Sequence, residues 1–192
     1  MGIGSVRWMG KILDALDANL TAIVTRQPVF FVATAPSGGG GHVNVSPKGG
    51  TGSFAVIDPT TVAYLDVTGS GVETIAHLRD NGRITVMFCT FEGPPLIVRL
   101  YGRGRAVLPG DDGFADLRAL FPDGVPGVRS VIRVEVERVA TSCGYGVPLM
   151  SYAADRTMLA EWAERRGPEG VEAYRAERNA VSIDGLPGLA TA

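Results

Sequence analysis

The segment HVNVSPKGG, residues 42 to 50, places a serine, a proline and a lysine directly after an extended apolar stretch. The chain has 18 basic residues, and only Lys11 and Lys48 among them are lysines. The ammonium group of lysine is a compact point charge that suits a phosphate, whereas arginine favours flat, bidentate partners. We therefore take Ser46 and Lys48 as candidate ligands of an anion. The alternative is a lysine exposed to water in a turn.

A second candidate for anion binding is the segment TGSGVET, residues 68 to 74, at the expected start of a helix. Its glycines allow backbone N–H groups to converge, and Ser70 and Thr74 add hydroxyls. Helix N-termini of this kind attract phosphate. Alternatively, Ser70 or Thr74 simply caps the helix. A lysine close to this turn would favour the phosphate interpretation.

Four arginines follow this turn in the sequence: Arg79, Arg83, Arg99 and Arg103. If the strand that starts at Arg83 pairs with the strand through Arg99, several guanidinium groups could face one cleft. Taken singly, each is better explained as a surface or ion-paired arginine. Together with Lys48 they favour an anionic ligand.

Motifs for other chemistries are absent from the sequence. His42 and His77 are the only histidines, and without an HExxH motif or a Cys/His group we expect no metal site. No GxSxG elbow, P-loop or GxGxxG after a strand is present, which disfavours acyl transfer, nucleotide hydrolysis and ordinary NAD binding. Tyr101 and His77 could donate protons, although a structural role fits each better. The catalytic residues stay unknown, and any reactive group is expected to come from a cofactor.

Composition limits the class of protein. The 192 residues are 45% hydrophobic and 20% charged, which is typical of one globular domain. A formal net charge of −2 provides no global positive field for nucleic acid, and no apolar run is long enough for a membrane span. Cys89 and Cys143 belong to no CxxC pair, as expected of buried thiols in a reducing compartment. We expect a cytoplasmic protein that binds neither nucleic acid nor membrane.

Hydrophobic periodicity predicts a single domain over residues 1–192, with an opening helix at 9–26, a β-rich core at 28–140 and a helical tail at 150–192. In the core, short strands are interrupted by single helices at about 72–82 and 111–121, and HVNVS is expected to end in a Pro-Lys-Gly turn. Only one strand–helix–strand unit occurs, so a parallel, doubly wound sheet is disfavoured. The pattern favours an α+β fold: an antiparallel barrel or curled sheet with helices outside.

The order of four segments resembles a known family: FFVATA, then HVNVSPKG, then VAYLDVTGSGVETIAHLRDNGRITVMFCTFEGPP, then VRLYGRGRAV. They are similar to the pyridoxamine 5′-phosphate oxidase-related, FMN-binding proteins, which are built on a split β-barrel. The resemblance covers about residues 26 to 140. The closing NAVSIDGLPGL looks like the tail of one uncharacterised branch of the family.

The resemblance implies a homodimer that binds FMN at the subunit interface. By this likeness Ser46 and Lys48 match the phosphate site at the strand end, Thr74 matches the helix site, and Arg79 and Arg83 flank it. It also implies an oxidoreductase acting on a small organic substrate. The alternative on the same fold is a protein that binds a flavin, a deazaflavin or haem without turnover. A third possibility is a decayed cofactor site in a dimer that serves as an interaction module.

The sequence departs from the oxidases of this family at three places. They carry an Arg-Lys pair at the start of the helix, where this chain has Glu73 and Thr74. Their Arg-Gln-Val-Arg strand is replaced by the segment from Ile97 to Arg99, and their C-terminal substrate-binding elements have no counterpart. We therefore expect a substrate other than pyridoxamine phosphate. As a further hypothesis, the segment SIDGLPGL folds over the cofactor cleft.

Overall fold

The structure, a computed structural model, describes residues 10–189. The strands are β1 (Ile12–Leu13), β2 (Val29–Thr34), β3 (Asn44–Gly49), β4 (Phe54–Asp58), β5 (Thr61–Val67), β6 (Arg83–Cys89), β7 (Leu96–Val107) and β8 (Val128–Cys143). The helices are α1 (Ala18–Val24), α2 (Glu73–Asp80), α3 (Phe114–Arg118) and α4 (Met158–Arg178).

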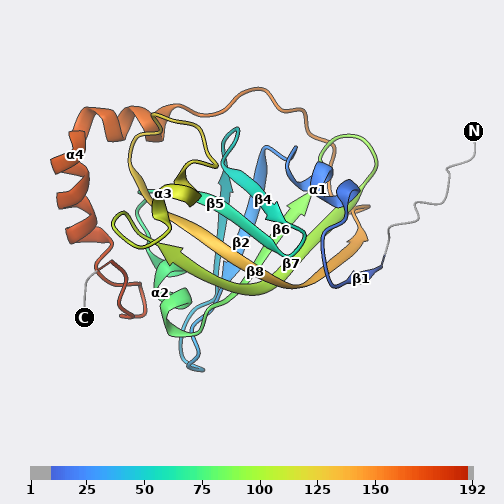
Figure 1. Ribbon diagram of the computed structural model, residues 1–192, viewed down its shortest axis with the longest axis horizontal. Coiled ribbons are helices and arrows are strands. Elements are labelled where there is room, and N and C mark those ends of the chain that lie inside the picture. Colours follow the sequence, from blue (N-terminus) through green and yellow to red (C-terminus); the bar gives the residue numbers. More distant parts are fainter. Residues whose placement is uncertain (1–9, 190–192) are drawn as a thin grey trace, which may run out of the picture.

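One antiparallel sheet forms the body of the protein, with the strand order β3-β2-β6-β7-β8-β5-β4 and with β1 added beside β8. The sheet curls, and the helices lie around it rather than inside it (Figure 1). The curl brings Lys48 on the edge strand β3 within 3.0 Å of Asp66 on β5, near the opposite end of the sheet. The predicted α+β split barrel with peripheral helices is confirmed.

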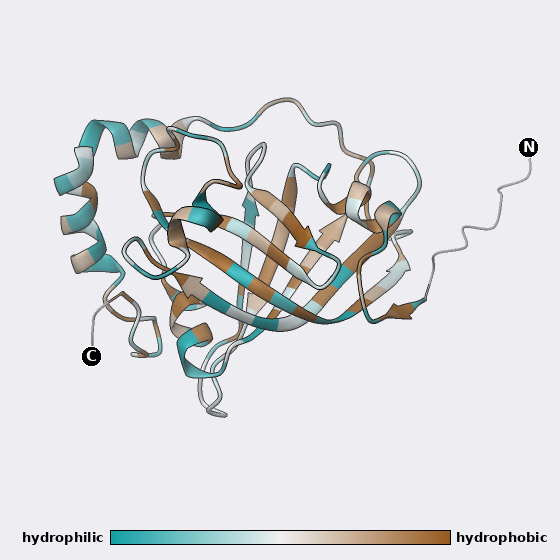
Figure 2. Ribbon diagram, viewed as in Figure 1, coloured by the Kyte–Doolittle hydropathy of each residue, from teal (hydrophilic) through white to brown (hydrophobic). Residues whose placement is uncertain are grey.

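The interior of the curled sheet is apolar. Four rings, Phe30, Phe54, Tyr64 and Phe88, pack with centroids 4.9 to 5.6 Å apart, most of them tilted or edge to face. Hydrophobic residues are frequent along the strands, whereas α4 is mostly hydrophilic (Figure 2). A smaller apolar cluster joins α3 to the outer face of β5 and β8. The barrel therefore has its own core, independent of α4.

Two glycines in β7, Gly102 and Gly104, allow close contacts. The register of β7 on β8 shifts between Tyr101 and Gly102, and a Cβ on Gly102 would lie 1.9 Å from the Glu135 carbonyl oxygen. A Cβ on Gly104 would lie 3.0 Å from Leu78, on α2. The bulge and the small residue let β7 bend and let α2 pack against it.

Three details of the predicted elements differ from the structure. The opening helix was expected over 9–26, but α1 begins after Asp17, whose carboxylate accepts a hydrogen bond from the Leu20 N–H, and residues 12–13 pair with β8. Residue 9 lies outside the described residues. The strand HVNVS does not end at Ser46: β3 continues through Pro47 to Gly49, since Pro is tolerated on an edge strand. The helical tail was expected over 150–192, but within the described residues it is helical only over Met158–Arg178, as two helices that meet at a kink at the non-helical Gly167, next to Pro168.

Candidate functional site

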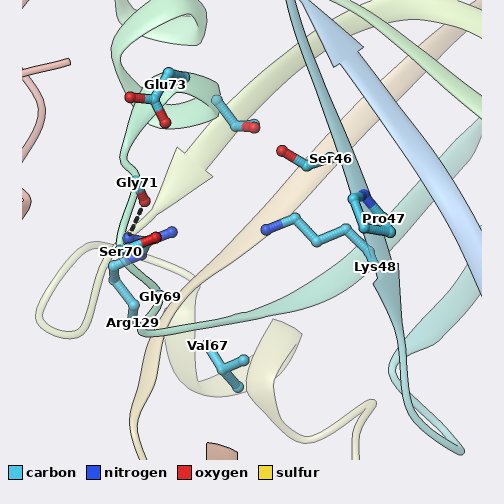
Figure 3. A pocket seen from close by; sticks show the side chains of 10 residues that line it. Ser46, Pro47, Lys48, Val67, Gly69, Ser70, Gly71, Glu73 and Arg129 are labelled. Carbon is cyan, nitrogen blue, oxygen red and sulfur yellow. Dashed lines mark hydrogen bonds between the residues drawn. The ribbon is translucent and has the colours of Figure 1, made fainter. Parts of the chain in front are cut away.

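A cavity of about 290 Å³ opens between β3, the turn after β5, the start of α2 and β8. Figure 3 shows the Lys48 side chain extending from β3 toward Arg129 and the turn of residues 69–71. The residues around the cavity are Ser46, Pro47, Lys48, Val67, Gly69, Ser70, Gly71, Glu73, Thr74 and Arg129. The structure thus brings Ser46 and Lys48 of β3 together with Thr74 of α2 around one cavity.

Strand alternation directs the polar side chains of β3 inward. Asn44, Ser46 and Lys48 are partly buried on one face, and the residues between them are exposed on the other. The side chain of a lysine in an exposed turn would extend into water, whereas the backbone of Lys48 is fixed by its strand pairing with Phe30. Its Nζ donates to Asp66 Oδ1 at 3.0 Å, and 22% of the side chain stays exposed. The expected alternative of a water-exposed turn lysine is wrong.

Asp66 and Arg129 form a buried ion pair beneath Lys48. Arg129 Nε donates to Asp66 Oδ2 at 2.8 Å, and the Ser130 hydroxyl donates to the same oxygen at 3.1 Å. Both charged side chains are at most 3% exposed. Burial by itself raises the pKa of Asp66, but the charges of Lys48 and Arg129 outweigh it and lower this pKa to about 2. Asp66 is therefore ionised at neutral pH and holds two cations in place.

A β-bulge aims Arg129 at this site. On β8, Ser130 pairs with Asp66 and Val128 pairs with Val67, so Arg129 is the extra residue between two pairs. Bulges of this kind re-aim a side chain. Besides its bonds to Asp66, the guanidinium group donates through Nη1 to the Gly71 carbonyl at 2.9 Å, as Figure 3 shows. Arg129 thereby ties β8 to the turn that precedes α2.

The first turn of α2 has no side-chain cap at its N-cap residue, Val72. The predicted alternative, in which Ser70 or Thr74 caps this helix, is therefore wrong. Thr74 Oγ1 instead accepts from Asn44 Nδ2 at 3.2 Å. The backbone N–H groups of a helix's first turn lack partners within the helix and carry its positive dipole end. Because residues of this first turn line the cavity, this end of the cavity is suited to an anion.

Asn44 organises the hydroxyls of the site. Its Oδ1 accepts from Ser46 Oγ at 3.0 Å, while its Nδ2 donates to Thr74 and to Thr34. Thr34 in turn contacts His77 Nδ1 at 3.0 Å. His77 is fully buried, and among the described residues its Nε2 has no hydrogen-bond partner. The histidine therefore supports the site from behind and cannot reach a molecule bound in the cavity.

Glu73 adds a negative charge to the rim of the cavity. Its carboxylate lies over Gly71, where a Cβ would come within 2.2 Å of Glu73 Oε2. Its Oε1 also accepts from the Ile183 N–H at 3.4 Å. In Figure 3 Lys48 and Glu73 enter from opposite sides. The cavity thus combines two cations with two carboxylates, one of them buried under the cations.

The other predicted arginines do not line this cavity. Arg79 donates to the Gly188 carbonyl, and Arg83 donates to Asn81 Oδ1 and the Pro36 carbonyl. Strands β6 and β7 do pair as expected, with Arg83 opposite Arg103. However, Arg99 and Arg103 contact Ser142 and the Asn81 carbonyl instead of a shared ligand site, because alternation turns them to the outer face of the sheet. The structure therefore does not bring these four arginines together around the cavity.

A second cavity adjoins the first. It has a volume of about 350 Å³ and lies between residues 68–70 and α4, whose Met158, Leu159, Trp162 and Tyr174 line it. Gly69 and Ser70 border both cavities. The turn before α2 is therefore a wall shared by a polar and a more apolar cavity.

Comparison with known proteins identifies the family. The family model for pyridoxamine 5′-phosphate oxidase matches residues 16–143. The chain belongs to this family. A pyridoxamine 5′-phosphate oxidase family protein of Aspergillus flavus, ustO, is 42% identical over 194 residues, covering 93% of this chain and 78% of the relative. The matched residues contain every residue that lines the first cavity, whereas α4, which lines the second, lies outside them.

Solved structures show weaker similarity. HupZ of Group A Streptococcus is 23% identical with a TM-score of 0.49, covering 65% of this chain and 91% of that chain. A FAD-binding protein of Mesorhizobium loti is 20% identical with a TM-score of 0.47, and the match covers 68% of this chain and 96% of that chain. An FMN-binding protein of Syntrophomonas wolfei is 14% identical with a TM-score of 0.46, and the match covers 63% of this chain and 80% of that chain.

Three residues at this cavity, Asp66, Arg129 and Asn44, are not predicted from the sequence. Asp66 carried a usable signal: it interrupts the apolar strand TVAYLDV, and a carboxylate in a buried strand needs a cation beside it. Asn44 alternates with Ser46 and Lys48, which places all three on one face. Arg129 carried no comparable signal, because its direction depends on the bulge.

Two kinds of feature are absent from the described residues, 10–189. No helix in this range is long and apolar enough to cross a membrane. The same range contains no group of three or more histidine, cysteine, aspartate or glutamate side chains arranged to hold a metal ion.

Proposed function

We propose that this chain binds FMN, with the phosphate in the cavity formed by Ser46, Lys48, Thr74 and the first turn of α2, and that it is a flavin-dependent oxidoreductase acting on a small organic substrate. The observation that carries the proposal is the convergence of a strand lysine and an uncapped helix N-terminus on one cavity. Membership of the pyridoxamine 5′-phosphate oxidase family supports it.

The donors present fit the phosphate end of a flavin. Lys48 supplies an ammonium group, Ser46 and Thr74 supply hydroxyls, and α2 supplies backbone N–H groups. At about 290 Å³ the cavity is slightly smaller than most ligand sites, which span roughly 300 to 1,000 Å³. It has room for the phosphate and part of the sugar chain, and the flavin ring must extend beyond it.

The residues of the chain bind and orient, whereas a bound flavin would supply hydride or electron transfer. Asp66 keeps Lys48 and Arg129 at the cavity, and Asn44 sets the hydroxyls of Ser46 and Thr74. Tyr101, a candidate proton donor in the sequence, lies on β7 and does not line the cavity. Within the described residues the cavity offers no histidine or tyrosine, so the chemistry would depend on the cofactor.

We further propose a cytoplasmic homodimer in which the partner subunit covers the flavin ring. Several large apolar side chains support an interface because they are exposed in the segment between β8 and α4. Leu149 is 82% exposed, Met150 57% and Tyr152 51%. A ring that extends from the cavity needs such a cover to be shielded from water.

A second candidate function is cofactor binding without turnover, with a flavin, a deazaflavin or haem as the ligand. Glu73 favours it, because its carboxylate stands on the cavity rim where a phosphate ligand would be more useful. A protein that takes up the cofactor but is not reduced by NADH, NADPH or a reduced deazaflavin would support this candidate over the oxidoreductase.

The first experiment is to denature freshly expressed protein and identify any released chromophore by mass. FMN is expected, and a deazaflavin or haem would point to the second candidate. The second experiment titrates FMN and riboflavin, which lacks the phosphate, against wild type, Lys48→Ala and the control Lys11→Ala. Lys11 is the other lysine and lies outside the cavity.

Lys48→Ala should raise the Kd for FMN about ten- to a hundredfold, since a hydrogen bond to a charged group is worth about 1.5 to 3 kcal/mol. The Kd for riboflavin should change little, and Lys11→Ala should resemble wild type. Equal affinities of the wild type for FMN and riboflavin would contradict a phosphate site.

A further inference from the structure

The chain folds back on itself after α4. Residues 179–189, here called the C-terminal loop, form a compact turn in which Val181 pairs with Pro187. The Gly188 N–H donates to the Ala180 carbonyl at 2.8 Å, and the Leu189 N–H donates to the Asn179 carbonyl at 2.8 Å. The loop is thus closed by its own backbone, and it has a defined position beside α2.

Asn179 connects this loop to the cavity. It ends α4 and is completely buried, which is rare for asparagine unless both ends of its amide are bonded. Its Oδ1 accepts from Arg129 Nη1 at 2.9 Å, and its Nδ2 donates to the Gly69 carbonyl at 3.1 Å. One side chain therefore contacts both the buried cation of the cavity and the turn that forms its wall.

The C-terminal loop also packs directly on α2. A Cβ on Gly188 would lie 2.5 Å from both Val72 Cγ1 and the Asn179 carbonyl oxygen, so this contact requires glycine. Arg79 donates to the Gly188 carbonyl, and the Ile183 N–H donates to Glu73. On the other side, the Asp184 carboxylate accepts from the backbone N–H of His42 at 2.8 Å. The loop is held at the same turn of α2 that faces the cavity.

The hydrogen bonds of Arg129 show what Asn179 contributes. The guanidinium group has five N–H donors. Nε and one N–H of Nη2 donate to Asp66. The two N–H groups of Nη1 donate to the Gly71 carbonyl and to Asn179 Oδ1. Among the described contacts, this leaves one Nη2 donor for a ligand. Without Asn179, the Gly71 carbonyl alone would hold Nη1, and the plane of the group could tilt.

We propose that Asn179 is a positioning residue of the anion site: by fixing Arg129 and the turn at Gly69, it sets the affinity of the cavity for phosphate. The C-terminal loop is then part of the ligand site without touching the ligand. This inference rests on the proposed phosphate site. It also gives a physical role to the segment SIDGLPGL, which supports the cavity from the outside rather than covering it.

The test compares Asn179→Ala with the matched control Asn81→Ala. Asn81 also uses both ends of its amide, to the Ala35 carbonyl and the Arg83 N–H, but at the opposite end of α2 and away from the cavity. Full-length protein freed of cofactor is titrated with FMN, riboflavin and inorganic phosphate. Urea unfolding of each variant measures the loss of stability separately.

Asn179→Ala should raise the Kd for FMN and for inorganic phosphate about tenfold, while the Kd for riboflavin stays within about twofold, because only the phosphate contact is disturbed. Asn81→Ala should keep the preference for FMN over riboflavin, whatever stability it loses in urea. A merely structural role for Asn179 would instead weaken FMN and riboflavin equally, and that result would overturn the inference.

A second variant covers the case in which Asn179→Ala does not fold. Asn179→Asp keeps an acceptor for Arg129 but adds a negative charge beside it, so phosphate affinity should fall while riboflavin affinity is kept. An unchanged preference for FMN would overturn the inference. If the wild type binds phosphate but not FMN, the proposed FMN-binding function fails, and the phosphate titration of the Asn179 variants still decides whether Asn179 positions the anion site. If the wild type binds neither ligand, both the proposed function and the role of Asn179 fail.

Discussion

Asp66 offers a quantitative test of the charge arrangement under the cavity. The substitution Asp66→Asn keeps the shape of the side chain and removes its charge, leaving the buried Arg129 without its ionic partner. Breaking a buried pair in this way costs about 3 to 5 kcal/mol. The free energy of unfolding at pH 7 should therefore fall by about that amount, as measured by urea denaturation.

The pH dependence of this difference follows from the pKa of Asp66. In the folded protein the pKa is lowered from 3.8 to about 2, because Lys48 and Arg129 more than offset the effect of burial. A group with a lowered folded-state pKa contributes stability above its unfolded-state pKa, and this contribution is lost as the pH falls toward the folded value. At about 1.4 kcal/mol per pKa unit, the contribution is about 2 kcal/mol.

The assay is urea denaturation of wild type and Asp66→Asn at a series of pH values from 7 to 2. The gap between their free energies of unfolding should narrow by about 2 kcal/mol between pH 5 and pH 2. Asp58→Asn is the control. Hydrogen bonds, first of all from the Thr60 backbone, also lower the pKa of Asp58, but water screens this exposed carboxylate. The difference in unfolding free energy between wild type and Asp58→Asn should therefore change less with pH. A difference in unfolding free energy between wild type and Asp66→Asn that stays constant from pH 5 to pH 2 would contradict the ion pairing of Asp66 with Lys48 and Arg129.

Two further predictions concern residues outside the cavity. Arg83→Ala should leave the Kd for FMN within about twofold of wild type in a fluorescence titration, because Arg83 contacts Asn81 and Pro36 instead of the cavity. A Kd about tenfold higher would mean that the phosphate binds elsewhere. Gly102→Ala should lower the free energy of unfolding by about 1 to 3 kcal/mol in urea, because its Cβ would lie 1.9 Å from a backbone oxygen. Gly38→Ala, where nothing lies within 4 Å of the added carbon, is the matched control, and equal losses in the two variants would contradict the packing at the bulge.

Much of the barrel could be predicted because its signals are local. The β-branched and aromatic run VFFVAT, residues 29 to 34, has the composition of a strand and forms β2, and Gly82 follows α2 with a positive φ of 71°. The end of β3 could not be predicted in the same way, since Pro47 is compatible with a turn and with an edge strand. Only the strand order, which places β3 at the edge, decides between them.

The candidate site could be predicted in part for the same reason. Lys48 stands out by composition, and the glycine-bearing turn before α2 is visible in the sequence. In contrast, Asn179 and Gly69 are 110 positions apart, and nothing local in either segment predicts their hydrogen bond. Arg129 likewise depends on the register shift between β5 and β8, which follows from the packing of the whole sheet.

The most direct test of the phosphate site is the position of the phosphorus atom in a crystal structure of the FMN complex. The account predicts phosphate oxygens about 3 Å from Lys48 Nζ and from the first-turn N–H groups of α2. A phosphate bound at the outer face of β6 and β7, beside Arg83 or Arg99, with Lys48 still engaged only by Asp66, would contradict it.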